Sequence, residues 1–409
     1  MVLSLPCSGQ YLLVPMDDSQ SDHLRAYGLT YWCLEAPRGC KCEWLLNYRG
    51  GSFLLPDAAA VKDRATELGV AVEPLSEGGR EKVHATIAQE NMEKVVLEKA
   101  PRVAVYIPPD AEPWDDAVAL ALDYAEIRYD KLWDAEVLQG KLKEYDWLHT
   151  HHEDFTGQFG KFWATFGHEA WYRRQVATAQ DEVKQFGFGS VQQLKGAVAA
   201  EIAKWVAGGG FLFAMCNACD TLDIALAAAG TDIVPPEIDG TPVDPNAQHK
   251  LDYGVTFCFK DFVLVTDANQ VEESDIDITP PDADFVGTGA TFELFEFSAK
   301  QDPIVTMLTQ CHTSHIRDFL GLTTSFRRSR LKDNVIIMGE RPDTDMVKYI
   351  HVDYGDGTAT YYAGHDPEDY AHVVGEEPTD LSLHKHSPGY RLILNNVLFP
   401  AARTKERKT

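Results

Sequence analysis

The chain has 409 residues, of which 44% are hydrophobic and 24% are charged, so it holds enough apolar material for one large core or two ordinary ones. This composition excludes a disordered tail and a small disulfide-stapled protein. The 37 Lys and Arg residues face 63 Asp and Glu residues, which gives a net charge of −26. Neither a broad phosphate-binding face nor a nucleic-acid partner is therefore expected. An acid excess of this size keeps a chain in solution and is also typical of proteins from saline habitats.

Cysteine usage and the first residues bear on the compartment. The eight cysteines are scattered and too sparse for a disulfide framework, which favours a reducing compartment. Residues 1–9 contain no basic residue and Pro6 breaks their apolar run, so they do not resemble a signal peptide. The apolar stretch 196–216 contains Glu201 and Lys204 and is not expected to span a membrane. The sequence as given predicts a cytoplasmic protein, whereas a start further upstream would allow export to the periplasm or beyond.

The first hundred residues (1–100) predict an N-terminal α/β subdomain. A short apolar run at 11–16 is followed by the polar residues 17–19 and then by apolar residues at helical spacing up to Leu34. Further elements are expected as strands at 43–48 and 70–72 and as a helix at 83–99.

From Pro101 onward, apolar strands and amphipathic helices alternate along the chain. The expected strands lie at 102–107, 129–133, 146–152, 211–215, 334–338, 349–352 and 358–362, and the expected helices at 115–127, 194–205 and 388–399. Such alternation is typical of a parallel sheet with helices on both faces. Residues 101–400 therefore predict a doubly wound, mostly parallel sheet, and a basic tail follows at 401–409.

Two segments interrupt this alternation. Residues 155–190 are rich in Phe, Trp and Tyr, which is too aromatic for a flexible loop and too irregular for one helix. We expect an inserted aromatic lid there. Residues 232–290 are rich in Pro, Asp and Thr around one expected hairpin at 255–265, which predicts a long surface excursion.

The strongest local feature is Cys216, which follows the apolar strand 211–215 and precedes a predicted helix. Ala214 and Ala218 flank it, and a tight strand-to-helix turn needs such small neighbours. This turn is expected to expose the sulfur near the positive end of the helix, which lowers the pKa of a thiol. Cys216 is thus a candidate nucleophile, with the backbone N–H of Asn217 as oxyanion donor. The alternative is a structural cysteine packed beneath the helix.

His365 is the candidate base for this thiol. It follows the late strand 358–362, and the carboxyl ends of different strands converge on one crevice in a doubly wound sheet. Cys216 and His365, with Asp366 or Glu368 orienting the imidazole, would form a Cys-His-acid triad. The alternative is a histidine that only caps its own loop.

The run His149-Thr150-His151-His152-Glu153-Asp154 is a second cluster of reactive side chains. Along a strand, His149 and His151 share one face and His152 lies on the other, and the run ends at the same sheet edge as the candidate nucleophile. Imidazoles and carboxylates placed in this way can hold Zn²⁺ or another transition metal. The candidate ligands are His149, His151, His152 and Glu153, with His365 or His312 as a further one. Their spacing matches no standard metal motif.

The small residues around Cys216, and the late strand that leads into His365 and Pro367-Glu368, resemble the class I glutamine amidotransferase domain. This resemblance implies a flavodoxin-like sheet in which Cys216 attacks an amide, His365 is the base and Glu368 orients it. Residues 357–365 and 387–400 are also similar to the related trehalose-utilisation-type domains, which share this sheet and are not all enzymes.

Over nearly its full length the chain resembles a group of uncharacterised bacterial proteins that are often labelled asparagine synthetase B. The similarity is carried by the segments Pro15–Asp18, Trp147–Gln158 and His384–Tyr390. Members of this group commonly begin with an export signal.

Together these features predict a cysteine-dependent amide hydrolase or amidotransferase-like enzyme that needs no cofactor. Its substrate is expected to be a small molecule or a peptide, and the sequence leaves its oligomeric state open. One alternative is a non-catalytic module of the same fold that binds a sugar or a peptide through the aromatic lid. Another alternative is a metallohydrolase built on the histidine-rich run.

Overall fold

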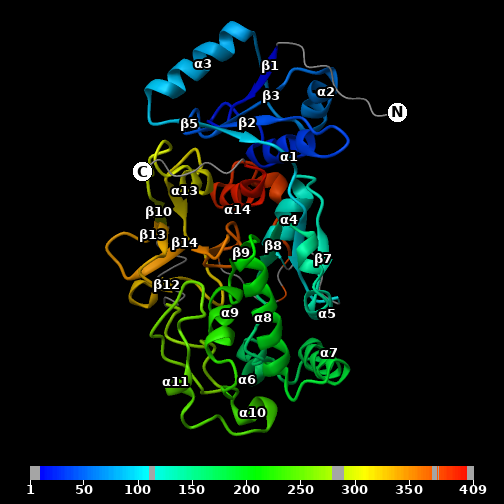
Figure 1. The fold of residues 1–409 in the computed structure, drawn as a ribbon, viewed down its shortest axis with the longest axis vertical. Coiled ribbons are helices and arrows are strands. Elements are labelled where there is room, and N and C mark those ends of the chain that lie inside the picture. Colours follow the sequence, from blue (N-terminus) through cyan, green and yellow to red (C-terminus); the bar gives the residue numbers. More distant parts are fainter. Residues whose placement is uncertain (1–9, 110–115, 279–289, 371–374, 376, 403–409) are drawn as a thin grey trace.

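The computed structural model describes residues 10–109, 116–278, 290–370, 375 and 377–402. Residues 1–9, which were not expected to form a signal peptide, and most of the basic tail at 401–409 lie outside these residues. Two sheets follow one another along the long axis of the molecule, and helix α14 (Pro388–Leu398) lies between them (Figure 1). Because α14 contacts helices that belong to both sheets, every residue from Gly389 to Leu398 is buried.

The smaller sheet is antiparallel throughout and has the order β4-β1-β3-β2-β5. Its strands are β1 (Tyr11–Val14), β2 (Cys42–Leu46), β3 (Ser52–Pro56), β4 (Glu73–Leu75) and β5 (Glu93–Leu97). Its helices are α1 (His23–Leu34), α2 (Ala59–Leu68) and α3 (Glu77–Gln89). The prediction of one helix over 83–99 is wrong, because the chain leaves α3 and pairs as β5 with β2. Burial of Val95 and Leu97 in that pairing outweighs the helical spacing.

The larger sheet has ten strands, and one part of it is parallel. This part has the order β7-β6-β8-β9-β15, with strands β6 (Val103–Tyr106), β7 (Asp130–Leu132), β8 (Trp147–Thr150), β9 (Phe211–Met215) and β15 (Gly357–Tyr362). Helices α4 (Ala117–Tyr124), α5 (Asp134–Leu138), α8 (Val191–Ala207) and α9 (Ala218–Ala227) accompany these strands. Alternate side chains of each strand enter two different apolar clusters, so both faces of the sheet are covered.

The remaining strands of the larger sheet are antiparallel, and they overturn the predicted fold class. The strands are β10 (Thr291–Leu294), β11 (His315–Arg317), β12 (Phe326–Arg327), β13 (Ile336–Glu340) and β14 (Met346–Tyr354). The prediction of a doubly wound, mostly parallel, flavodoxin-like sheet is therefore wrong, since the larger sheet is mixed and the smaller one is antiparallel. The physical cause is the tight turn at Gly355 (φ +63°), which pairs β14 directly with β15 in antiparallel fashion, whereas both strands were assigned to a parallel sheet.

The two interrupting segments have different structures. Residues 159–186 form the short helices η3 (Phe159–Lys161) and α6 (Trp163–Phe166) and the long helix α7 (Ala170–Phe186). In the 232–290 segment, the expected hairpin at 255–265 is replaced by isolated bridges and the short helices α10 (Pro236–Asp239) and α11 (Ala247–Lys250). The carboxylate of Asp223 accepts three backbone N–H groups of this segment at 2.8 Å each, which fixes it to α9. Residues 279–289 lie outside the described part.

Candidate metal centre

The candidate residues gather where the parallel strands of the larger sheet end. His151 and His152 directly follow β8, Cys216 follows β9, and His365 follows β15. Asp116 comes from the segment after β6, where its side chain caps α4 by accepting the backbone N–H groups of Val118 and Ala119. Because parallel strands share one carboxyl edge, four separate parts of the chain meet there.

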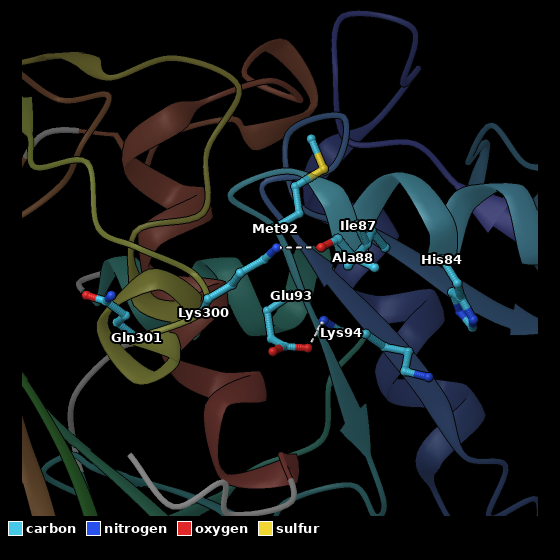
Figure 2. A pocket seen from close by; sticks show the side chains of 8 residues that line it. All are labelled: His84, Ile87, Ala88, Met92, Glu93, Lys94, Lys300 and Gln301. Atoms are coloured by element: carbon cyan, nitrogen blue, oxygen red, sulfur yellow. Dashed lines mark hydrogen bonds between the residues drawn. The ribbon is translucent and has the colours of Figure 1, made fainter. Parts of the chain in front are cut away.

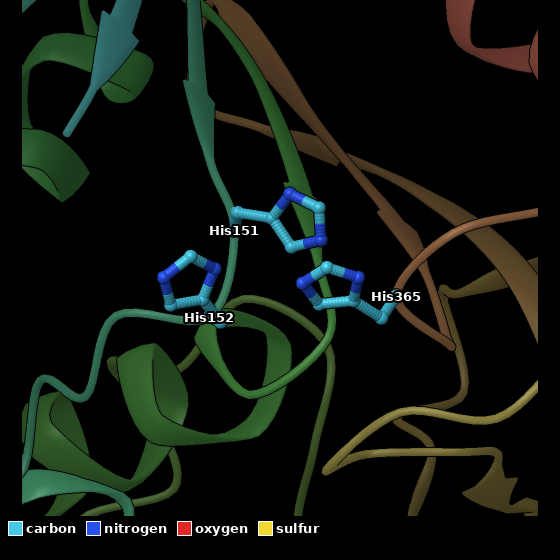
Figure 3. A group of neighbouring side chains, drawn as sticks. All are labelled: His151, His152 and His365. Atoms are coloured by element: carbon cyan, nitrogen blue, oxygen red, sulfur yellow. The ribbon is translucent and has the colours of Figure 1, made fainter. Parts of the chain in front are cut away.

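Three imidazoles form the centre of this edge. The ring centroid of His365 lies 4.3 Å from that of His151 and 5.7 Å from that of His152. One nitrogen from each ring can be chosen so that all three lie within 4.8 Å of one another, and Figure 3 shows the three rings gathered together. His151 is completely buried, His365 is nearly so, and His152 is partly exposed. A histidine cluster of this kind can bind a metal ion.

A second group shares His151. The Oδ1 atom of Asp116 lies 3.3 Å from Nδ1 of His151 and 3.5 Å from Nε2 of His149, and all three side chains are fully buried. Burial alone would raise the pKa of Asp116, but the two imidazoles hold it well below its usual value. Burial lowers the pKa of His151 to about 4, so this ring is neutral at pH 7 and has a lone pair available for a metal.

Glu153 lies beside the same histidines. Its Oε2 atom accepts the backbone N–H of His151 at 2.9 Å, and its Oε1 atom has no hydrogen-bond partner among the described residues. Burial raises the pKa of Glu153, while the nearby His152 lowers it. Three of the predicted ligands, His149, His151 and His152, are therefore brought together with Glu153 next to them. His312 is not part of this group, because it stacks on His23 at the junction with the smaller sheet.

Cys216 has the predicted turn but a different environment. Its φ of 51° is left-handed, which a non-glycine residue adopts only under strain. The sulfur is completely buried and accepts the backbone N–H of Leu322 at 3.2 Å and that of Asn217. The expectation of an exposed, acidic thiol is wrong, because the 320–324 loop covers the sulfur and burial raises its pKa to about 12.

His365 is held by the same loop as Cys216. Its backbone N–H donates to the carbonyl of Leu320 at 2.8 Å, and that of Gly364 donates to Thr323. The structure thus brings the candidate nucleophile and the candidate base to one loop.

The two acids proposed to orient His365 have other strong contacts. The Oε2 atom of Glu368 lies 2.9 Å from Nδ1 of His384 and accepts the hydroxyl of Tyr370 at 2.7 Å. Asp366 accepts the backbone N–H of Glu368 at 2.9 Å, and burial raises its pKa. The orienting role of either acid stays a prediction.

Sequence reasoning missed Asp116. A signal was present, since an Asp that directly precedes an apolar run is typical of a helix N-cap. A cap, however, does not indicate what its second oxygen faces. The contact with His149 and His151 exists only because β6 and β8 are neighbours in the sheet.

A separate pocket lies on the other sheet. Its volume is about 690 Å³, and it is lined by α3, β5 and the 300–301 segment (Figure 2). Lys300 closes one side of it by donating to the backbone carbonyl of Ala88 at 2.7 Å. This pocket shares no residue with the histidine centre.

No protein-family model and no curated protein matches this chain. Solved structures with a similar course include two cytoplasmic proteins of Salmonella typhimurium. The first is 10% identical with a TM-score of 0.35 and covers 74% of this chain and 100% of its own. The second is 11% identical with a TM-score of 0.32 and covers 64% of this chain and 88% of its own. A GH42 β-galactosidase is 10% identical with a TM-score of 0.31 and covers 66% of this chain and 28% of its own.

Likeness at this level carries no argument about function. The resemblance to glutamine amidotransferases and to proteins labelled asparagine synthetase B stays a prediction. As expected, none of the described helices is both long and apolar enough to cross a membrane.

Proposed function

We propose that the protein is a metal-dependent hydrolase whose ion is bound by His151, His152 and His365. The observation that carries this proposal is the approach of three imidazole nitrogens to within 4.8 Å at the carboxyl edge of the parallel strands. Three imidazole nitrogens are a ligand set of catalytic zinc, which keeps a fourth position for water. When bound, such an ion lowers the pKa of its water and polarises a carbonyl group.

The surroundings favour an uncharged substrate such as an amide or an ester. Burial, followed by nearby carboxylates, raises the pKa of Asp220 to about 8, and burial likewise raises the pKa of Glu273. Lys161, whose Nζ lies 3.9 Å from Glu273, faces these acids and also donates to the backbone carbonyls of Val265 and Glu272. A phosphate or carboxylate substrate would therefore find little free positive charge here. Glu153, a buried carboxyl group next to His152, is the candidate proton acceptor for the water.

The test begins with metal content. Chelator-stripped protein is dialysed against Zn²⁺, Co²⁺ or Mn²⁺, its metal is measured by mass spectrometry, and it is then assayed on a panel of amides and esters. We expect metal-dependent hydrolysis that His365→Ala abolishes and that the matched variant of an exposed histidine, His168→Ala, leaves unchanged. Wild-type protein that binds none of the three metals would refute the proposal.

One observation favours a second candidate, the cysteine-dependent amidase. The left-handed backbone at Cys216 is the strain expected of a nucleophile on a strand-to-helix turn. In this case amide hydrolysis survives chelation and is lost in Cys216→Ala. Activity that needs metal and persists in Cys216→Ala would exclude this candidate.

A further inference from the structure

Asp116 poses a problem of charge. Its carboxylate is fully buried, and its Oδ1 atom accepts the backbone N–H groups of Val118 and Ala119 at 2.8 Å and 2.9 Å. The ion pairs of the described residues give it only His149 and His151, with no lysine or arginine. Its Oδ2 atom has no hydrogen-bond partner there either. A buried anion without a compensating cation is costly, so something positive is expected beside it.

The tautomer of His149 points to the same place. Nδ1 of this ring lies 3.0 Å from the backbone carbonyl of Phe213, and a carbonyl oxygen can only accept, so Nδ1 carries the proton. In a neutral ring, Nε2 then has a lone pair, which faces Oδ1 of Asp116 at 3.5 Å. Two lone pairs that face one another repel unless a cation lies between them. A histidine that donates its other N–H to a backbone carbonyl is also the usual arrangement of a metal ligand.

The two ring nitrogens of His151 face different neighbours. Neither ring nitrogen has a hydrogen-bond partner among the described residues, and the side chain is completely buried. Nδ1 faces Asp116 at 3.3 Å, while the opposite edge of the ring faces His365 (Figure 3).

The distances fit a metal better than hydrogen bonds. A charge-assisted hydrogen bond from a ring nitrogen to a carboxylate is about 2.7–2.9 Å long. Ligand atoms about 2.0–2.1 Å from a tetrahedral zinc lie about 3.3 Å from each other. The observed separations of 3.3 Å and 3.5 Å match the second spacing.

We propose that Asp116, His149 and His151 hold a second divalent transition-metal ion, and that the ring of His151 bridges it to the first. This inference rests on the proposed function for the position of the first ion. When both nitrogens of His151 bind metal, the ring releases its N–H proton to solvent, and no electron is transferred. The second site is closed, since all three of its side chains are fully buried, so this ion orients His151 and does not meet substrate.

The stoichiometry of bound metal tests the bridge. Stripped protein dialysed against Zn²⁺ should hold two ions per chain. His149→Ala and His365→Ala should each hold one, and the control His168→Ala should hold two. Asp116→Asn is a milder variant, because Asn still caps α4. Asp116→Asn should lower the affinity for the second ion at least tenfold, while circular dichroism shows that the fold is intact.

Loading with Cu²⁺ gives a readout that depends on the bridge itself. Two Cu²⁺ ions joined by one imidazole ring couple magnetically, so the electron paramagnetic resonance signal should fall well below two spins per chain. His149→Ala should restore one uncoupled spin.

Three outcomes would overturn the inference. One ion in wild-type protein that both His149→Ala and Asp116→Asn leave in place would show that His149 and Asp116 only orient His151, and the proposed function would stand. Two uncoupled Cu²⁺ ions would exclude the bridge. No bound ion in wild-type protein would refute the inference and the proposed function together.

Discussion

His23 should make the protein sensitive to acid. It is buried at the junction of the two sheets, where its Nε2–H donates to the backbone carbonyls of Met16 and Asp17, each at 3.0 Å. Its Nδ1 atom therefore accepts from His386, and Arg391 lies close to the same cluster. Burial, followed by the charge of Arg391, lowers the pKa of His23 to about 3. The folded protein thus keeps this ring neutral in mild acid.

The expected loss of stability follows from the unfolded state. An unfolded histidine has a pKa of about 6.5 and binds a proton as the pH falls, whereas folded His23 does not until about pH 3. The stabilising contribution is therefore complete above about pH 6.5 and is lost progressively as the pH falls toward 3. At pH 5 the unfolded state is favoured about 30-fold more than at neutral pH, which corresponds to about 2 kcal/mol.

Urea unfolding at pH 7 and pH 5 measures this effect. His23→Gln keeps an N–H donor but cannot gain a proton, so it should lose about 2 kcal/mol less than wild type between the two pH values. Other titrating groups contribute equally to both proteins and cancel in the comparison. The exposed His168 serves as control, and His168→Gln should follow wild type. An equal pH dependence in wild type and His23→Gln would refute the reasoning.

Three other variants address buried groups. Burial raises the pKa of Asp220 to about 8, so the ionisation of this carboxyl group in the unfolded state disfavours folding above pH 4. Asp220→Asn should therefore raise the free energy of unfolding at pH 7 by on the order of 2 kcal/mol. Urea unfolding at pH 3 should show no difference in stability between this variant and wild type. Lys348 and Asp318 form a fully buried ion pair at 2.9 Å. Because Lys348→Met leaves a buried carboxylate without its partner, it should lower the stability measured by thermal unfolding by about 3–5 kcal/mol. The double variant with Asp318→Leu should lose less stability. An equal cost in both would contradict this account. Cys216 should react with Ellman's reagent only on unfolding, because its side chain is completely buried, whereas Cys40 and Cys311 are the partly exposed cysteines of the described residues. Cys216→Ala should therefore leave the number of thiols that react in the native protein unchanged.

The sequence predicted which residues form the site better than it predicted what surrounds them. Cys216 and His365 were recognised because each follows an apolar strand, and strand ends are visible in local periodicity. His151 and His152 were recognised as part of the unusual run from His149 to Asp154. Whether the sulfur is exposed depends on Leu322, which lies 106 residues further along the chain. No local pattern contains that information, so the thiol was predicted to be accessible when it is not.

The wrong sheet type has a more local origin. The strands predicted at 349–352 and 358–362 are present as β14 and β15, but they were assigned to a parallel sheet. The pair Gly355-Asp356, which forms the turn between them, is a hairpin signal that the sequence did contain. Antiparallel pairing of these strands then allows β13 and β10 to extend the sheet in the same manner. A single turn that was not recognised in the sequence therefore accounts for much of the error in the predicted fold class.

The ionisation states decide between the two kinds of chemistry at this edge. The thiol of Cys216, with a pKa of about 12, would have to lose its proton at a cost of about 7 kcal/mol at pH 7 before it could attack a carbonyl. His151 is already neutral at that pH, because its pKa is about 4, and the lone pair of its unprotonated nitrogen needs no further step to bind a metal. The covered thiol is thus far from its reactive state, whereas the uncharged His151 can bind a metal ion directly. The same burial that makes Cys216 a poor nucleophile therefore makes His151 a good ligand.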